Sequence, residues 1–225
     1  MPTQLAYRPD IDGLRAIAVL NVLLFHAGFT FAKSGFVGVD VFFVISGYLI
    51  TGHIRRDISA DAFSLGNFYA KRIKRLLPAA YATIVVCLCT APFMLSGTEG
   101  RDFGKQIMGA VGFISNYILK NQTGYFEGAA DLKPLLHTWS LSVEEQFYFL
   151  IPPLLLMIPF RAHGVFLAMI TIASYLGCWF AKANPETVFY TLPYRAWELG
   201  LGALASFFVL PKRFGLKIRV ASLLF

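Results

Sequence analysis

The chain has 225 residues, of which 56% are hydrophobic and 15% are charged, and its mean hydropathy of +0.60 excludes an ordinary soluble domain. Its net charge of +7 is compatible with nucleic-acid binding, but the basic residues lie in short segments between apolar runs, as in the cytoplasmic loops of membrane proteins. We therefore expect a membrane protein that contacts lipid and binds no nucleic acid.

Six apolar segments are long enough, at about 20 residues each, to cross a hydrocarbon core roughly 30 Å thick. The first carries Arg15 and His26 and has no small-residue cleavage site, so we expect a retained span rather than a secretory signal. The last residues, 221–225, read as the start of a further apolar segment, which predicts a truncated membrane domain. The six segments cover residues 14–32, 36–54, 77–96, 142–160, 164–181 and 193–210.

A weaker apolar segment at 106–119 decides the predicted topology. If it crossed the membrane, the basic residues of 211–219 would lie on the opposite side from those of 55–76, against the positive-inside rule. We therefore expect a re-entrant or interfacial helix around 106–119 and a cytoplasmic N-terminus. Residues 63–76, which are apolar and basic by turns, are typical of another helix lying in the inner interface.

Ionisable residues within predicted spans are costly and mark functional sites by default. His26 lies about six residues before the outer end of the first span, and Asp40 about four residues after the outer start of the second, so we expect them at nearly the same depth. Such a carboxylate would orient the imidazole for proton abstraction, although a purely structural hydrogen bond explains the spacing too. Arg15 precedes His26 by about three helical turns, on a similar face and roughly 16 Å closer to the cytoplasm. These residues predict a polar pathway.

Two further charged groups accompany this pathway. Glu144 and Glu145 enter the fourth span from outside, and since neighbours on a helix point about 100° apart, only one of them can face a cavity. Both could equally lie in water at the interface. On the cytoplasmic side, Arg72 and Arg75, with Tyr69 beside them, form an Arg-x-x-Arg pair suited to bidentate contacts with phosphate oxygens. The same basic cluster is also explained as a topology signal alone.

Other chemistries have no support in the sequence. Cys87, Cys89 and Cys178 lie in apolar runs with no CxxC pair and no nearby histidine, so we expect no metal site. The sequence also has no Gly-rich nucleotide loop and no GxSxG elbow.

Several motifs follow one another in order along nearly the whole chain. They are Asp12-Gly-Leu-Arg15-Ala followed by His26, Gly35 to Gly47, Phe68-Tyr69 through Arg72 and Arg75 to Pro78, Trp139-Ser-Leu with Glu144 and Phe147-Tyr148, and Arg195-Ala-Trp-Glu198. This ensemble resembles the acyltransferase-3 family of bacterial integral membrane acyltransferases. The resemblance predicts an all-α, polytopic transmembrane helix bundle, with residues 1–225 forming one acyltransferase-3-like domain that is incomplete at its C-terminus.

The resemblance also implies an activity and its residues. The chain is expected to be an O-acyltransferase of the bacterial inner membrane that moves an acetyl or other acyl group from cytoplasmic acetyl-CoA to a hydroxyl of a periplasm-facing glycan or lipid-linked sugar. Three catalytic residues are implied, His26, Asp40 and Glu144. Four donor-binding residues are implied, Arg15, Tyr69, Arg72 and Arg75. Residues 7–12 are similar to a subgroup that carries a C-terminal SGNH domain, which is absent from this chain.

Two rival hypotheses use the same residues. In a proton-coupled transporter, Arg15, His26, Asp40 and Glu144 would form a proton relay, although the inverted repeat common in transporters is missing from this stretch. In a scaffold without chemistry, exchange of the buried polar residues for apolar ones of similar size would be tolerated. Release of free thiol from acetyl-CoA separates the enzyme from both.

Overall fold

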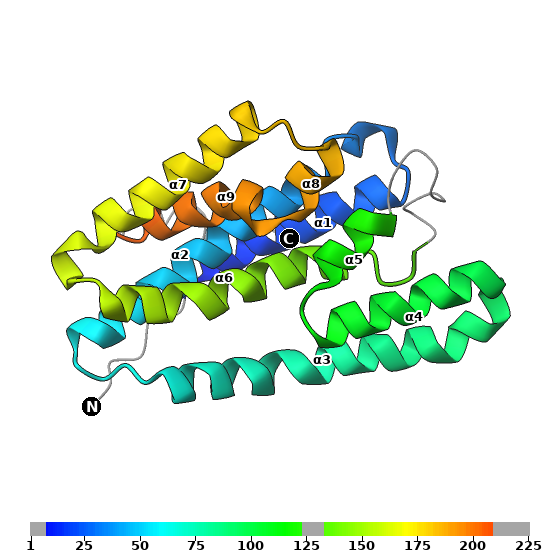
Figure 1. Ribbon diagram of the computed structural model, residues 1–225, viewed down its shortest axis with the longest axis horizontal. Coiled ribbons are helices and arrows are strands. Elements are labelled where there is room, and N and C mark those ends of the chain that lie inside the picture. The colour runs from blue at the N-terminus through cyan, green and yellow to red at the C-terminus, as the bar shows by residue number, and fades with distance from the viewer. Residues whose placement is uncertain (1–7, 123–132, 209–225) are drawn as a thin grey trace. The chain divides into compact units, whose positions relative to one another are not determined.

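The computed structural model describes residues 8–122 and 133–208, and Figure 1 shows that the described chain is built from helices. The described residues contain no strand, which confirms the predicted all-α fold. The elements in chain order are α1 (Pro9–His26), η1 (Thr30–Ala32), α2 (Val37–Ser59), α3 (Leu65–Met94), α4 (Gly97–Val111), α5 (Ser115–Gln122), α6 (Thr138–Met157), η3 (Phe160–Ala162), α7 (His163–Phe180), α8 (Pro185–Tyr190) and α9 (Leu192–Ala205).

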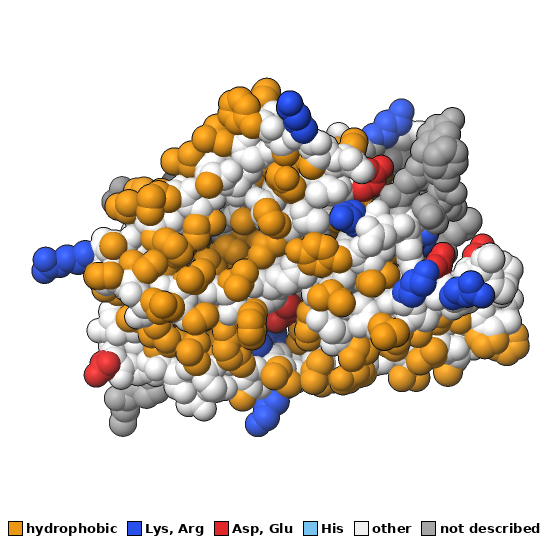
Figure 2. All heavy atoms as spheres, viewed as in Figure 1, with side chains coloured by type: hydrophobic (Ala, Val, Ile, Leu, Met, Phe, Trp, Pro, Cys, Tyr) orange, Lys and Arg blue, Asp and Glu red, His pale blue; other side chains and the backbone are white. Residues whose placement is uncertain are grey.

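Three helical segments in the described part are long and apolar enough to cross a membrane, namely Val37–Ser59, Leu65–Met94 and Phe160–Phe180. Hydrophobic side chains stay exposed along α3, where Val85, Val86 and Phe93 are more than half exposed. Figure 2 shows hydrophobic side chains along the edge of the molecule that α3 forms. Water does not favour such a surface, whereas lipid does. The chain is therefore a membrane protein. The predicted features at 211–219 and 221–225 lie outside the described residues.

The first helix ends earlier than its hydropathy predicts. Helix α1 stops at His26, whereas the apolar segment runs to residue 32. Gly28 has a φ of +78°, and the amides of Gly28 and Phe29 donate to the carbonyls of Phe25 and Leu24. This is a Schellman motif, which ends a helix at a residue that tolerates positive φ. The glycine therefore overrides the apolar run that continues beyond it.

The predicted interfacial helix at 63–76 and the predicted span at 77–96 form one continuous helix. Helix α3 starts after Ser64, whose side chain accepts a hydrogen bond from the Asn67 amide (3.4 Å), and it continues through Pro78 to Met94. Its 30 residues span about 45 Å, which exceeds the hydrocarbon thickness of roughly 30 Å. The basic Arg-x-x-Arg element therefore extends the same helix that carries the apolar span.

The predicted helix at 106–119 is interrupted in its middle. Helix α4 ends at Val111 and α5 begins at Ser115, and Phe113 between them has a φ of 54°. At its start, α4 is capped by Glu99, whose carboxylate accepts from the Ser96 amide (2.8 Å) and hydroxyl (2.6 Å). With 15 and 8 residues, neither helix reaches the roughly 20 residues that a crossing requires. Their lengths agree with a segment that does not cross.

The described chain divides into two compact units. The first contains α1, the part of α2 up to Gly52 and the part of α9 from Glu198, and the second contains His53–Trp197. In the first unit, a Cβ placed on Gly38 would lie 2.5 Å from the Ala18 carbonyl oxygen, and one on Gly202 would lie 1.8 Å from the Val44 carbonyl oxygen. Only glycine permits such close approach, so small residues set the packing of α2 against both neighbours.

The second unit has a small apolar core between α3 and α4. Ile84, Phe103 and Leu135 are almost fully buried there, with Cys87 packed against them. Beside this core, Gln106 Nε2 donates to Gln122 Oε1 (2.9 Å), which joins α4 to α5. Because buried amides are costly unless they are paired, these contacts hold the α4–α5 hairpin in one arrangement.

Candidate functional site

Helix α1 places Arg15 and His26 on one face. Both residues lie within the same uninterrupted helix, and their spacing of eleven residues corresponds to about three turns. Arg15 Nη1 lies 3.9 Å from Asp12 Oδ1, and the Arg15 side chain is 37% exposed. The alignment of the two residues along α1 therefore agrees with the sequence prediction.

The ring of His26 contacts the backbone of its own helix, and this contact favours one tautomer. Nδ1 lies 2.8 Å from the backbone carbonyl oxygen of Val22, one turn earlier in α1. A carbonyl oxygen only accepts, so Nδ1 donates, and the lone pair of the neutral imidazole resides on Nε2. Sequence reasoning looked for a carboxylate as the orienting group and missed this backbone contact, which any helical histidine can make.

Asp40 lies level with Arg15 rather than with His26. Helices α1 and α2 are antiparallel, because Gly35 approaches Asn21, Gly38 approaches Ala18, and Tyr48 contacts Arg8. This register puts Asp40 opposite the residue after Arg15 and roughly 15 Å along the axis from His26. The expected equal depth of His26 and Asp40 is therefore wrong, because α1 ends at His26 and residues 27–36 make the reversal.

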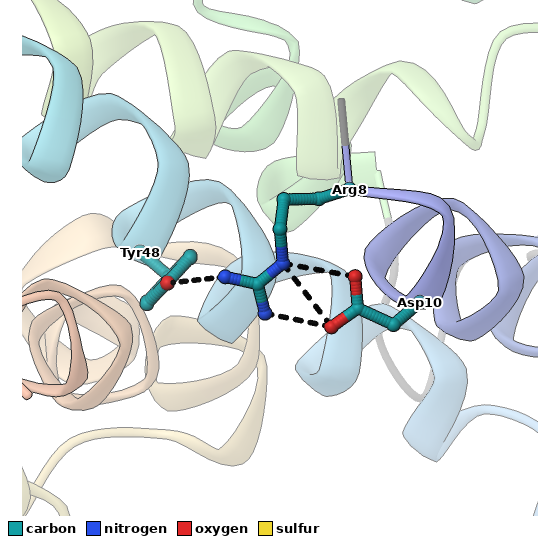
Figure 3. A network of polar contacts seen from close by, with 3 residues as sticks. All are labelled: Arg8, Asp10 and Tyr48. Carbon is teal, nitrogen blue, oxygen red and sulfur yellow. Dashed lines mark hydrogen bonds and ion pairs between the residues drawn. The ribbon is translucent and has the colours of Figure 1, made fainter. Parts of the chain in front are cut away.

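Arg8, Asp10 and Tyr48 join the start of α1 to α2, as Figure 3 shows. Arg8 Nε lies 2.9 Å from Asp10 Oδ1, and Arg8 Nη1 donates to the Tyr48 hydroxyl (3.2 Å). The hydrogen bond from Arg8 lowers the pKa of Asp10, and the same bond raises the pKa of Arg8. This network holds the two helices in the register that places Asp40.

In the second unit, Arg72 of α3 forms an ion pair with Glu145 of α6. Arg72 Nη2 lies 2.5 Å and Nε lies 3.5 Å from the two carboxylate oxygens, and the side chains are only 21% and 14% exposed. The guanidinium carbon also lies 3.9 Å from the centre of the Tyr148 ring. Three residues before Arg72, the Tyr69 hydroxyl donates to the Phe149 carbonyl (2.8 Å). These contacts make α3 and α6 antiparallel neighbours.

This pair corrects the predicted depths of the two charged motifs. The sequence placed Arg72 in the cytoplasmic interface and Glu144 and Glu145 near the outer end of the fourth span. The ion pair requires Arg72 and Glu145 to share one level, about seven residues or roughly 10 Å along α6 from Thr138. The difference arises because α3 is continuous, so Arg72 lies on the same helix as the apolar span and not on a separate interfacial helix.

The paired motif residues have different environments. Arg75 is exposed one turn along α3 from Arg72, which is half-buried. Glu144 is half-buried next to Glu145 and points away from it by about 100°. Of the two adjacent glutamates, Glu145 contacts the arginine, so they do not share one role. Two predicted site residues of this unit thus lie apart from the ion pair. Arg75 is exposed, and Glu144 lies on another face of α6 than Glu145.

An uncharged polar network next to Glu145 was not predicted from the sequence. Gln146 Nε2 donates to Asn116 Oδ1 (2.9 Å) and to the carbonyl of Phe113 (2.9 Å), the residue with positive φ. Asn116 Nδ2 in turn donates to the Tyr190 carbonyl (3.0 Å). The network ties α5 and α8 to α6. In the sequence, this network is indicated only by Asn116 and Gln146 within apolar segments, because their partners are distant in sequence.

A cavity of about 190 Å³ lies between α3, α4 and α6, beyond the ion pair. Its wall includes Leu76, one turn from Arg72, and Leu141, one turn from Glu145. The hydroxyls of Thr83 and Ser142 at this wall donate to carbonyls of their own helices, so the lining is effectively apolar. The described residues contain no group of three or more His, Cys, Asp or Glu arranged to hold a metal ion.

Arg195 packs against two aromatic rings that also contact each other. Its guanidinium carbon is 4.8 Å from the centre of the Phe189 ring and 5.6 Å from that of Trp139, and its Nε donates to the Phe189 carbonyl (2.9 Å). These contacts connect the motif that begins at Trp139 with the motif that begins at Arg195 through α8, which gives both a shared structural role.

Comparisons with known proteins agree on one family. A family model described as an acyltransferase domain matches residues 8–225. The chain is 36% identical over 207 residues to a Komagataeibacter xylinus protein named as membrane-bound transacylase BcsY, which covers 91% of this chain and 52% of that protein. It thus spans about half the length of this relative.

Two further relatives are named as O-acetyltransferases. A Staphylococcus aureus protein is 41% identical over 155 residues, covering 68% of this chain and 25% of that protein. The peptidoglycan O-acetyltransferase OatA of Listeria monocytogenes is 35% identical over 211 residues, covering 89% of this chain and 34% of OatA. No solved structure matches the chain significantly.

Proposed function

The chain belongs to the acyltransferase-3 family of membrane acyltransferases, and from this premise we propose that it is the membrane part of an O-acyltransferase. It transfers an acetyl or other acyl group from acetyl-CoA in the cytoplasm to a hydroxyl of a glycan or lipid-linked sugar. The acceptor lies on the periplasmic side of a bacterial inner membrane, which the chain crosses several times from a cytoplasmic N-terminus. The names of the relatives support acyl transfer, and they do not favour the transporter hypothesis.

The observation that carries this proposal is the arrangement of α1. Its face bears Arg15 and, about three turns later, His26 with its lone pair on Nε2. A neutral imidazole with an oriented lone pair is the usual general base near pH 7. The contact with the Val22 carbonyl orients the ring from within the helix.

We assign proton transfer to His26. In a direct route, Nε2 takes the proton of the acceptor hydroxyl while the hydroxyl oxygen bonds to the thioester carbonyl carbon. The carbon–sulfur bond then breaks, and the thiolate leaves with the proton from the imidazolium. In a two-step route, Nε2 itself attacks the thioester and carries the acetyl group to the acceptor. Both routes release one free thiol per transferred acyl group.

The other predicted site residues have supporting roles. Arg75 and Arg72, with Tyr69, bind the phosphates of the donor from the cytoplasmic side, and Arg15 attracts the donor or stabilises the developing oxyanion. Asp40, level with Arg15 in the first unit, and Glu144 on α6 of the second unit complete the set of residues that we assign to catalysis. Because Asp40 lies roughly 15 Å along the helix axis from His26, its position supports an electrostatic role and not direct contact with the imidazole ring.

Thiol release tests the assignment of His26. Membranes containing the protein, acetyl-CoA and a candidate glycan should release thiol, and His26→Ala should lower this rate by about two to four orders of magnitude by removing the general base. The variant should still be present in the membrane. Acetyl-His26 trapped in the absence of acceptor would identify the two-step route, whereas normal transfer by His26→Ala would refute the catalytic assignment.

A further inference from the structure

We propose that Glu145 is an exchangeable counter-ion, which occupies Arg72 while the site is empty and gives up the guanidinium to a phosphate of the incoming acyl donor. This inference rests on the proposed function, because it concerns how the donor enters. It assigns a positioning role to a residue of α6 that touches neither the reacting thioester nor the acceptor.

The contacts with α6 hold the Arg72 guanidinium in an orientation suited to anion binding. Glu145 takes its Nε and Nη2 edge, and the Tyr148 ring covers its face. Both α6 residues lie on one side of the helix, since they are three positions apart. A planar fork held at one edge and one face is pre-organised, so the next anion that arrives meets a fixed donor geometry.

Burial explains why a resident anion is needed. The side chain of Arg72 is 21% exposed, and a cation withdrawn from water without a partner is strongly destabilising. Glu145 removes this cost in the empty site. Because the pair is not sealed from solvent, the exchange of one anion for another remains accessible.

Charge explains why phosphate can replace the carboxylate. Lys71, Arg72, Lys74 and Arg75 give four positive charges within five residues, against the single carboxylate that contacts Arg72. A phosphate group has more charge than a carboxylate and more acceptor oxygens, so it can engage Arg72 and also the exposed Arg75 one turn away. Each donor that binds then releases Glu145.

The affinity of a Glu145→Gln variant for coenzyme A tests this exchange. The protein is reconstituted in lipid nanodiscs, and coenzyme A itself is the probe. If Glu145 competes for Arg72, its neutral isostere should bind coenzyme A roughly five- to tenfold more tightly at low salt, and the gain should shrink as salt is raised. Arg72→Ala should bind more weakly than the native protein.

Glu99→Gln is the matched control, because it removes one exposed carboxylate of the same unit, which accepts hydrogen bonds from the amide and the hydroxyl of Ser96. It should leave the affinity unchanged. Equal or weaker binding by Glu145→Gln, with Arg72→Ala still impaired, would overturn the exchange and leave the proposed function standing. Absence of coenzyme A binding by the native protein would overturn both.

A measurement on the native protein decides the question if Glu145→Gln fails to fold. Carbodiimide-mediated amidation of carboxylates, read by mass spectrometry, reports how accessible Glu145 is. Its labelling rate should rise when coenzyme A is added, while that of Glu99 stays constant. A labelling rate at Glu145 that stays constant or falls would contradict its release from Arg72.

Discussion

Arg8 connects two helices through one guanidinium group. It contacts Asp10 in the first turn of α1 and Tyr48 in α2. Because the Asp10 carboxylate is held by this cation, its pKa lies below the ordinary value. Protonation of Asp10 therefore competes with the folded arrangement of the first unit, and acid should weaken the docking of α1.

The sign of this effect can be tested with Asp10→Asn. A carboxylate with a lowered folded-state pKa contributes stability above its unfolded pKa of about 3.9, and this contribution is lost as the pH falls through the folded pKa. For a partly exposed pair the contribution is roughly 0.5–1 kcal/mol. Thermal unfolding in detergent should therefore show Asp10→Asn below the native protein at pH 7, with the difference shrinking below pH 4. A difference independent of pH would contradict this account.

His26 shows how one backbone atom can set the chemistry of a side chain. The carbonyl of Val22 fixes the proton on Nδ1, so the basic nitrogen is determined by the helix that carries it. The orientation of the imidazole by Val22 is compatible with a carboxylate that acts on it from a distance.

At the scale of elements, the close packing of α9 against α2 depends on Gly202. A Cβ on Gly202 would lie 1.8 Å from the Val44 carbonyl oxygen, whereas a Cβ on Gly13 in α1 would meet nothing within 4 Å. The same substitution, Gly→Ala, should therefore have opposite effects at the two positions.

Gly202→Ala should destabilise the protein by about 1–3 kcal/mol, because α2 and α9 must separate to fit the methyl group. Gly13→Ala should be neutral or stabilising by up to about 1 kcal/mol, because alanine favours a helix over glycine. Unfolding midpoints of the two variants in the same detergent provide the comparison. Equal midpoints would show that α2 and α9 do not approach each other at Gly202.

Helix α3 combines two roles that hydropathy separated. Its apolar part supplies a membrane span, and its first turns supply Tyr69, Arg72 and Arg75. Pro78 lies within the helix without ending it, so one continuous helix carries both the charged face and the span.

At the scale of the whole molecule, the topology depends on the segment around 106–119. If α4 and α5 do not cross, Glu99 and Asn184 lie on the same side of the membrane, and if they cross, the two lie on opposite sides. Asp61, between α2 and α3, is the reference for the side that the positive-inside rule predicts to be cytoplasmic.

Single cysteines distinguish the two topologies. In a background without Cys87, Cys89 and Cys178, we expect Glu99→Cys and Asn184→Cys to react with a membrane-impermeant maleimide on intact spheroplasts. Asp61→Cys should react only after permeabilisation, because basic segments stay in the cytoplasm. Protection of Asn184→Cys alongside labelling of Glu99→Cys would show that the segment crosses.

Local patterns were enough to predict the helical fold, the membrane location and the family. Apolar length predicts helices because a bilayer leaves backbone groups no other partners, and the spacing of Arg15 and His26 places them on one face because helix geometry is constant. The end of α1 was also signalled locally, by Gly28, although the longer apolar run concealed it.

Contacts between distant residues were decided only by the packed structure. Arg72 and Glu145 are 73 positions apart, and their pairing depends on how α3 and α6 lie side by side. The level of Asp40 likewise depends on the register of α1 against α2, which Gly35 and Gly38 determine by close backbone approach. Hydropathy describes each helix against lipid, whereas the register between helices comes from side-chain packing and polar pairs, which no single segment contains.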